Sequence, residues 1–202
     1  MKHTHPELYG LVLAGGKSTR MGSDKRLLQY HSVPQQSYIY QLLESVCKRT
    51  FLSIRDEQKS EMEENFEVMM DQNEFRGPFN GILSAHKAFP DAAWLVLACD
   101  LPLIDEKTLA LLVSKRNPEK MATSMATNKT GLPEPLVTIW EPTGLKKAIA
   151  YLKTAESSCP RKYLLNSEIE LVFPGNDEVL FNANSLEDYE HIKSKLEPTH
   201  GK

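Results

Sequence analysis

Hydrophobic residues in this chain form short continuous runs that are separated by longer amphipathic segments. Two runs, YGLVLA at residues 9–14 and AWLVLA at residues 93–98, contain no charged residue, and EPLVTIW at residues 134–140 is nearly as apolar. Continuous apolar runs, as opposed to alternating ones, are typical of central parallel strands that are covered on both faces. The pattern therefore predicts buried strands at these three places.

Helical periodicity occurs between and after these runs. Tyr38, Leu42 and Val46 follow one another at four-residue spacing, which predicts a helix with one apolar stripe. Strands alternate with helices over the first half of the chain, which indicates a three-layer α/β domain. Helices are expected at residues 35–49, 79–89, 105–116, 141–154 and 185–197, and shorter strands at 50–55, 66–70, 121–126, 169–173 and 178–183.

The composition fits one globular domain without a nucleic-acid partner. The chain has 202 residues, of which 41% are hydrophobic and 25% charged, and its net charge is −3. We expect a single domain over residues 1–202, with a core of about residues 8–196 and a short frayed tail at 197–202. The mildly acidic balance provides no overall basic surface for nucleic acid.

The cysteines and the apolar runs bear on the cellular compartment. Cys47, Cys99 and Cys159 are widely separated and form no CxxC pair, which argues against a disulfide framework or a structural zinc site. The first ten residues lack the apolar stretch of a secretory signal, and no apolar run approaches the length of a membrane span. We therefore expect a cytoplasmic protein with no membrane partner.

A glycine-rich, cationic segment, LAGGKSTRMGSDK at residues 13–25, follows the first predicted strand. Ligands of open parallel sheets bind where loops leave the carboxyl ends of strands. Gly15 and Gly16 would let backbone N–H groups approach an anion closely. Phosphate oxygens could be neutralised by four nearby cations, Lys17, Arg20, Lys25 and Arg26. The alternative is an ordinary strand-to-helix turn with solvated cations, and the spacing alone favours neither.

A carboxylate, Asp100, stands just past the second buried strand, in the segment LVLACDLPLI at residues 95–104. It faces the same sheet edge as the glycine segment if the two strands run parallel. A bound polyphosphate is usually accompanied by Mg²⁺, which proteins hold through one or two carboxylates and the phosphate oxygens. Asp100 is therefore a candidate Mg²⁺ ligand. The alternative is a turn former or helix cap, although Asp105 is better placed to cap the helix predicted there.

The segment at residues 13–25 closely resembles the nucleotidyltransferase signature L-A-G-G-x-S-x-R-M-G-x-D-K, and is most similar to the molybdenum cofactor guanylyltransferase branch. The resemblance implies a three-layer Rossmann-like fold with a mostly parallel mixed central sheet. It also implies that Lys25, Arg20 and Asp100 are catalytic, and that Asp100, which matches the family's D-x-P motif, binds Mg²⁺. The nucleotide is expected to contact Leu13, Ala14, Gly15, Gly16, Lys25, Asp71 and Asp100.

Two further motifs extend the resemblance along most of the chain. Asp71 and the G-P-x-x-G sequence at residues 77–81 match a family motif, which implies that Asp71 lies near the base or ribose. The segment FNANSLEDY resembles the family's N-x-N-T-P-E-D, so Asn182 and Asn184 are expected near the acceptor or the metal. The structural alternatives are a Gly-Pro turn for the first motif and an amide-stabilised turn for the second.

The chain departs from the family pattern where Ser185-Leu186 replaces Thr-Pro. The Ser185 hydroxyl can still cap the following helix, with Asp188 completing an approximate capping box. Arg161 stands in a basic stretch where, by resemblance, it would meet the acceptor's phosphate. The alternative for Arg161 is simple solvation, because most surface cations have no specific partner.

The resemblance implies a magnesium-dependent enzyme that transfers GMP from GTP to molybdopterin, or to its molybdenum-loaded form, and releases pyrophosphate. GTP and molybdopterin are the expected substrates, and other cofactor-biosynthesis or acceptor proteins are candidate partners. Two alternatives stay open. One is the same chemistry with CTP or with a sugar-phosphate acceptor, and the other is a non-catalytic adaptor that binds a nucleotide for a partner enzyme.

Overall fold

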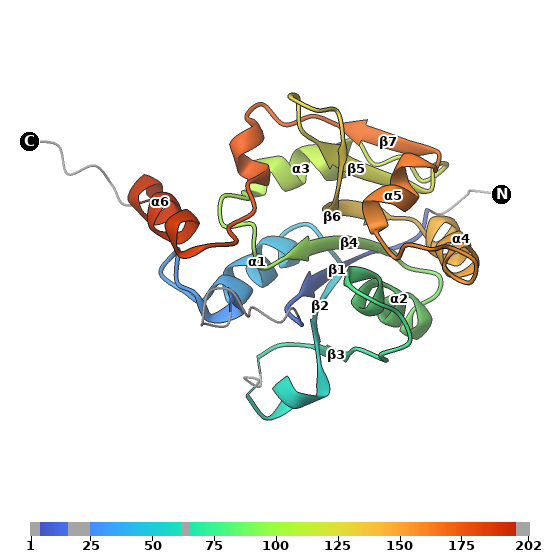
Figure 1. Cartoon of the computed structure of the whole chain (residues 1–202), viewed down its shortest axis with the longest axis horizontal. Coiled ribbons are helices and arrows are strands. Elements are labelled where there is room, and N and C mark those ends of the chain that lie inside the picture. Colours follow the sequence, from blue (N-terminus) through green and yellow to red (C-terminus); the bar gives the residue numbers. More distant parts are fainter. Residues whose placement is uncertain (1–4, 16–24, 62–64, 197–202) are drawn as a thin grey trace, which may run out of the picture.

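Seven strands form one mixed sheet in the order β3-β2-β1-β4-β6-β5-β7 (Figure 1). The computed structural model describes residues 5–15, 25–61 and 65–196. The strands are β1 (Leu8–Leu13), β2 (Arg49–Ile54), β3 (Val68–Met70), β4 (Ala93–Ala98), β5 (Ala122–Ala126), β6 (Pro133–Trp140) and β7 (Ile169–Val172). β1 pairs in parallel with both β2 and β4, whereas β6 runs antiparallel to both of its neighbours. The mixed α/β fold class is therefore confirmed.

The described residues form six α-helices and three 3-10 helices, of which η3 and α6 follow the last strand. The α-helices are α1 (Gln35–Glu44), α2 (Pro78–Ala88), α3 (Glu106–Ser114), α4 (Pro142–Leu152), α5 (Pro160–Leu165) and α6 (Leu186–Leu196). The 3-10 helices are η1 (Lys25–Leu27), η2 (Asp56–Glu61) and η3 (Asp177–Leu180). Among the described residues, no helix has the length and apolar character that crossing a membrane would require.

Apolar side chains cover both faces of the sheet and create three layers. On β4, Leu95 and Leu97 belong to a buried cluster that includes residues of α1 and α3. Trp94 and Val96, on the other face, belong to a cluster with residues of α2, α4 and α5. Every residue of β4 is buried. This two-sided burial explains why the strand is a continuous apolar run in the sequence.

The predicted helix starts are confirmed at two caps. Asp105 is the N-cap of α3, and its Oδ1 accepts a hydrogen bond of 2.8 Å from the backbone N of Thr108. At α6, the hydroxyl of Ser185 accepts from the backbone N of Asp188, and the Asp188 carboxylate accepts from the backbone N of Ser185. This reciprocal pair is a capping box. The replacement of Thr-Pro by Ser-Leu therefore leaves the helix start intact.

The strand predicted at residues 178–183 is wrong, because this segment begins within the 3-10 helix η3. Asn176 caps η3 by accepting a hydrogen bond from the backbone N of Glu178 at 3.0 Å. The Asp177 carboxylate accepts from the backbone N of Asn128 at 2.8 Å and of Lys129 at 3.0 Å. These side chains satisfy backbone donors locally, which favours a turn over a strand despite the apolar residues.

α6 packs against the loop residues that follow η1 through a small apolar and aromatic cluster. Ile192 of α6 is buried with Tyr30 and Ala183, and Tyr189 packs against them. The rings of Tyr30 and Tyr189 lie 5.0 Å apart. In Figure 1, α6 lies at the far left, away from α4 on the right. Ala183, just before α6, therefore lies next to Tyr30, which follows β1 and η1 in the chain.

Close packing of α4 against the residue before β5 generates a stability prediction. A Cβ added to Gly144 would lie 2.1 Å from the backbone oxygen of Met121, which no side-chain rotation can relieve. We expect Gly144→Ala to lower the free energy of unfolding by about 3 kcal/mol in urea denaturation. Gly175→Ala is the matched control, because a Cβ there meets nothing within 4 Å. The control should be neutral or stabilising by up to about 1 kcal/mol, and equal losses in both variants would contradict this packing.

Candidate active site

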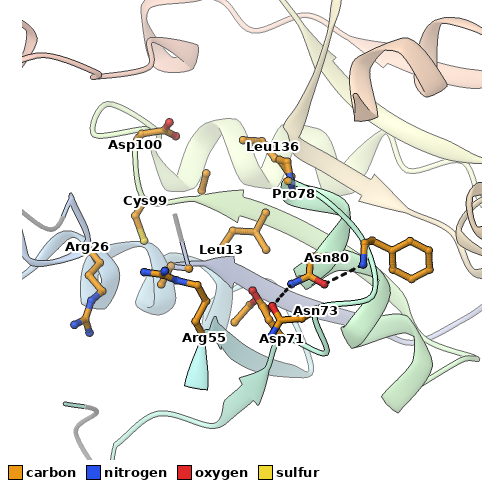
Figure 2. A pocket seen from close by; sticks show the side chains of 17 residues that line it. Leu13, Arg26, Arg55, Asp71, Asn73, Pro78, Asn80, Cys99, Asp100 and Leu136 are labelled. Atoms are coloured by element: carbon orange, nitrogen blue, oxygen red, sulfur yellow. Dashed lines mark hydrogen bonds between the residues drawn. The ribbon is translucent and has the colours of Figure 1, made fainter. Parts of the chain in front are cut away.

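A cavity of about 510 Å³ opens at the carboxyl ends of the parallel strands β1, β2, β3 and β4 (Figure 2). Its lining comprises Leu13, Ala14, Gly15, Arg26, Ser53, Arg55, Asp71, Asn73, Phe75, Gly77, Pro78, Asn80, Gly81, Ala98, Cys99, Asp100 and Leu136. Gly15 and Asp100 therefore face one cavity, because β1 and β4 run parallel and end at the same edge. The structure brings together the residues described from the predicted nucleotide set: Leu13, Ala14, Gly15, Asp71 and Asp100.

The rest of the glycine segment falls largely outside the described residues. Gly16, Lys17 and Arg20 lie outside them, and so does the side chain of Lys25, whose backbone begins η1. Arg26 is described, lines the cavity and is only 2% exposed. A nearly buried guanidinium at this edge adds positive charge where the sequence predicts a polyphosphate.

The carboxylate of Asp71 is held in place by β2. The hydroxyl of Ser53 donates a hydrogen bond of 2.5 Å to Asp71 Oδ1. Burial raises the pKa of Asp71, while the hydrogen bond from Ser53 and the positive charge of Arg55 act in the opposite direction. The other carboxylate oxygen, Oδ2, would lie 3.1 Å from a Cβ at Gly15. The glycine bend and this carboxylate therefore approach each other more closely than a side chain at Gly15 would comfortably allow.

Gly81 is required for close packing beneath the same carboxylate. A Cβ at Gly81 would lie 2.5 Å from Ser53 Oγ and 2.8 Å from Leu13 Cδ2. Gly77, at the start of α2, adopts φ +61° and ψ −149°, a conformation that is essentially restricted to glycine. Glycine is therefore needed at the two positions of the G-P-x-x-G sequence for different reasons. Gly77 turns the backbone, and Gly81 lets α2 approach β1 and β2.

Side chains of α2 hold the loop between β3 and α2 in shape. Asn80 donates from Nδ2 to Asn73 Oδ1 at 3.4 Å, and its Oδ1 accepts from the backbone N of Phe75 at 3.3 Å (Figure 2). Asn73 has φ +57°, a left-handed conformation that asparagine tolerates. Ser84 accepts a hydrogen bond from the backbone N of Gln72 at 2.9 Å. The cavity wall next to Asp71 is thus built before any ligand binds.

The loop that carries Asp100 is fixed through its backbone carbonyls. Gln35 Nε2 donates to the oxygen of Leu101 at 3.3 Å, and Tyr38 donates to that of Ile104 at 2.9 Å. His31 Nε2 lies 3.0 Å from the oxygen of Pro102, so this nitrogen is the donor. The His31 ring also stacks on Tyr38 at 3.6 Å, and burial lowers the pKa of His31. These contacts set the position of Asp100 without involving its carboxylate.

The C-terminal asparagine motif lies beside Asp100. The backbone N of Ala183 donates to the backbone oxygen of Asp100 at 2.8 Å. Asn182 and Asn184 are the chain neighbours of Ala183, and their amide Nδ2 atoms donate to backbone oxygens of their own segment, those of Leu180 and Asn182. Neither asparagine lines the cavity described above. Their contact with acceptor or metal stays a prediction.

The residues at this edge fit a magnesium ion that also binds a polyphosphate. Within the described part of the chain, no group of three or more His, Cys, Asp or Glu side chains is arranged to hold a metal by itself. Mg²⁺ usually takes one or two carboxylates and completes its shell with phosphate oxygens and water. Asp100 supplies a carboxylate on the cavity wall, opposite the glycine bend, so a shared metal and phosphate site is chemically consistent.

Arg161 lies apart from the cavity lining. It is inside α5, not in a stretch that precedes a helix, as the sequence suggested. Its Nε donates to the backbone oxygen of Pro133 at 2.9 Å, and its Nη2 donates to Glu134 Oε2 at 2.8 Å. Burial raises the pKa of Glu134, and the charge of Arg161 opposes this shift. Arg161 is therefore held by β6, and its contact with an acceptor stays a prediction.

Sequence reasoning missed Arg55, Asn73 and Asn80 as cavity residues. Arg55 directly follows β2, the parallel neighbour of β1. Like Asp100, Arg55 is a charged residue just past a parallel strand, so the same sequence pattern indicates it. Asn73 and Asn80 carry no comparable signal, because their positions depend on how one loop folds back onto α2.

Comparison with known proteins agrees with this geometry. Residues 10–168 match the model of the MobA-like NTP transferase domain. The chain is 38% identical over 186 residues to a molybdenum cofactor biosynthesis bifunctional protein from Synechocystis, covering 92% of this chain and 53% of that protein. The chain thus spans about half the length of this relative.

A second relative and a solved structure have the same extent as this chain. A molybdenum cofactor guanylyltransferase from Pseudomonas fluorescens is 31% identical over 185 residues, covering 88% of this chain and 89% of that protein. The molybdopterin-guanine dinucleotide biosynthesis protein A from Archaeoglobus fulgidus superposes with a TM-score of 0.73 at 19% identity, covering 93% and 97% of the two chains. This last likeness supports the fold. The matched domain and the first two relatives together show that this chain belongs to the MobA-like NTP transferase family.

Proposed function

We propose that this chain transfers GMP from GTP to molybdopterin, or to its molybdenum-loaded form, and releases pyrophosphate. The observation that carries the proposal is the shared cavity of Gly15 and Asp100 at the carboxyl ends of β1 and β4. The names of the relatives from Pseudomonas fluorescens and Archaeoglobus fulgidus support guanine nucleotide chemistry with a molybdenum cofactor. Nucleotidyltransferase activity itself agrees with the family to which the chain belongs.

In this proposal the chain acts by positioning and by charge, without a covalent nucleophile. A phosphate oxygen of the acceptor attacks the α-phosphorus of GTP in line, and pyrophosphate leaves from the opposite side. Gly15 and Gly16 would cradle the phosphates. Leu13 and Ala14 form the adjoining wall, and the backbone N of Ala14 itself donates to the oxygen of Ser53 at 3.1 Å. Arg20 and Lys25 offset the charge that develops on pyrophosphate. These roles rest on the family resemblance and on the position of residues 13–15 at the cavity.

Asp100 is the proposed ligand of Mg²⁺. When bound, Mg²⁺ would neutralise charge on the phosphates during transfer. The carboxylate of Asp100 would hold the ion on the β4 side of the cavity, and the backbone contacts of residues 101–104 would keep the carboxylate in place. Asn182 and Asn184, next to Asp100 through Ala183, would help to orient the acceptor. Arg161 would meet the acceptor's phosphate from the β6 side.

The alternatives differ in nucleotide, acceptor or turnover. CTP or a sugar-phosphate acceptor would use the same strand-end geometry, so substrate assays must separate them. The adaptor alternative drew support from Ser185-Leu186 in place of Thr-Pro. Because the capping box of α6 forms with these residues, the replacement offers no sign of a lost function. The three cysteines are free, which agrees with the proposed cytoplasmic location.

The main test of the proposal is turnover with purified molybdopterin. The protein, Mg²⁺ and molybdopterin should release pyrophosphate with GTP, and more slowly or not at all with CTP, ATP or UTP. In thermal denaturation with Mg²⁺, GTP should raise the midpoint most, since a tightly bound ligand stabilises the folded state. Selective GTP binding without pyrophosphate release would favour the adaptor, and a preference for CTP would favour the cytidylyl alternative.

Replacing the proposed metal ligand should abolish turnover and spare the fold. Asp100→Asn removes the charge that would bind Mg²⁺, so magnesium-dependent pyrophosphate release should fall by at least about a hundredfold. Asp105→Asn is the matched control from the same loop, because asparagine caps helices about as well as aspartate. The control should retain activity. Full activity in Asp100→Asn would remove Asp100 from the mechanism.

Burial of the Asp71 carboxylate is expected to lower the stability of the free protein at neutral pH, while the same carboxylate contributes to GTP binding. Its pKa is raised in the folded state, so the free energy of unfolding falls as pH rises through the window above the unfolded value of 3.8. Asp71→Asn should remove this loss, so its stability relative to wild type should rise from acidic to neutral pH in urea denaturation. GTP binding should weaken in the same variant.

Asp177→Asn provides a control of opposite sign. Backbone hydrogen bonds from Asn128 and Lys129 lower the pKa of Asp177, so its stabilisation is present at neutral pH and lost on acidification. Relative to wild type, this variant should be least stable at neutral pH. The same pH trend in both variants would contradict the assignment of burial as the cause at Asp71.

A further inference from the structure

Arg55 stands out among the cavity residues because no hydrogen bond of its guanidinium to another described residue is found. Its Nε is buried and has no hydrogen-bond partner among the described residues. By contrast, Arg116 binds Glu141 through two hydrogen bonds of 2.7 and 2.9 Å, and Arg49 pairs with Glu67. Burying part of a cation without a partner is costly, and such a cost is common where a ligand completes the site.

The backbone of Arg55 is held in place beside the glycine bend. Gln58, only 5% exposed, accepts a hydrogen bond from the backbone N of Arg55 at 3.0 Å and donates to the oxygen of Ala14 at 3.2 Å. Gln58 thereby joins the end of β2 to the end of β1. The link fixes the backbone of Arg55 at the cavity edge, next to the glycine bend.

A donor and an acceptor lie side by side at this point. A Cβ at Gly15 would lie 3.5 Å from Arg55 Cγ and 3.1 Å from Asp71 Oδ2, so the two side chains flank the same glycine. Arg55 also acts electrostatically on Asp71, yet no hydrogen bond or ion pair joins the two side chains. In the view of Figure 2, the Arg55 side chain lies between Cys99 and Asp71. The guanidinium extends from Cγ toward Cys99, so the cavity presents its donors and the Asp71 carboxylate as two separate groups of one lining.

This arrangement complements one nucleobase. Guanine carries two acceptors, N7 and O6, followed along the same edge by two donors, N1–H and the 2-amino group. Arginine binds O6 and N7 through a bidentate fork, and a carboxylate can accept from N1–H and the amino group. Cytosine and adenine each present an amino donor in place of O6, which would face the guanidinium.

Resting on the proposed function, we infer that Arg55 determines guanine specificity by donating to O6 and N7, next to Asp71. The alternative is that the Arg55 guanidinium binds the triphosphate and not the base. The two differ in one respect: a phosphate contact would strengthen binding of every nucleoside triphosphate equally, whereas a base contact acts only on nucleotides that carry the O6 and N7 acceptors.

The first experiment measures binding to the wild-type protein with Mg²⁺ by calorimetry. GTP is compared with 7-deaza-GTP, which lacks only the N7 acceptor, and with the triphosphate of 2-aminopurine riboside, which lacks both O6 and the N1–H donor. Both analogues should bind more weakly than GTP, by about tenfold or more. Equal binding of GTP and 7-deaza-GTP would overturn the inference while leaving the proposed function standing. Failure of GTP itself to bind in preference to CTP would count against the proposed function.

The second experiment repeats these titrations with Arg55→Gln. We expect GTP to lose about tenfold or more in affinity, the two analogues to lose less because each retains only one of the two acceptors, and the difference between GTP and 7-deaza-GTP to disappear. Arg76→Gln is the matched control, because Arg76 is exposed and lies outside the cavity lining. This substitution removes the same charge as Arg55→Gln. It should bind all three nucleotides as the wild type does.

Two outcomes in Arg55→Gln would overturn the inference. An equal loss for all three nucleotides would put Arg55 on the triphosphate, and retained discrimination against 7-deaza-GTP would put the N7 contact on another group. Thermal denaturation of the ligand-free variants checks that the fold is preserved. Arg55 is partly exposed and makes no side-chain hydrogen bond among the described residues, so the variant should melt close to the wild type.

Discussion

The site depends on the parallel pairing of β1 with β2 and β4. Backbone hydrogen bonds align Leu13 with Ser53 on one side and with Ala98 on the other, so three strands end level with one another. Everything that follows these ends must then meet at one edge: the glycine bend, Arg55 and Asp100. The reversal of β6 closes this edge from the other side with Leu136. The cavity is therefore a consequence of strand direction before any side chain contributes.

Close approach at this edge requires the absence of side chains at particular positions. Gly81 lets α2 approach Ser53 and Leu13, and Gly15 leaves room for the Asp71 carboxylate. Burial of that carboxylate raises its pKa, and Ser53 and Arg55 only partly oppose the shift. The free protein thus holds a donor and an acceptor that are incompletely satisfied by each other. A purine with complementary groups would complete both, which links the packing of the edge to the choice of ligand.

The sequence predicted those features that depend on local patterns. The apolar run at residues 93–98 matches β4 residue for residue, and the run at 9–14 matches β1 to within one residue, because two-sided burial leaves a continuous apolar signal. The meeting of Gly15 with Asp100 followed from placing both after parallel strands. The segment at 178–183 failed because Asn176 and Asp177 bind backbone donors, and this competition is invisible to a hydrophobic count. Likewise, the positions of Asn73 and Asn80 depend on how the loop before α2 folds back onto that helix, which no hydrophobic pattern signals.

The central claim is that one cavity holds the polyphosphate at Gly15 and its divalent ion at Asp100. The most direct measurement is a crystal structure of the protein with GTP and Mn²⁺, in which anomalous scattering locates the metal. The account predicts a metal peak at the Asp100 carboxylate and triphosphate density along the glycine bend, in the same cavity. A metal or nucleotide bound elsewhere, for example in the open cavity between α1 and α6 that Tyr30, Tyr38 and Lys193 line, would contradict it.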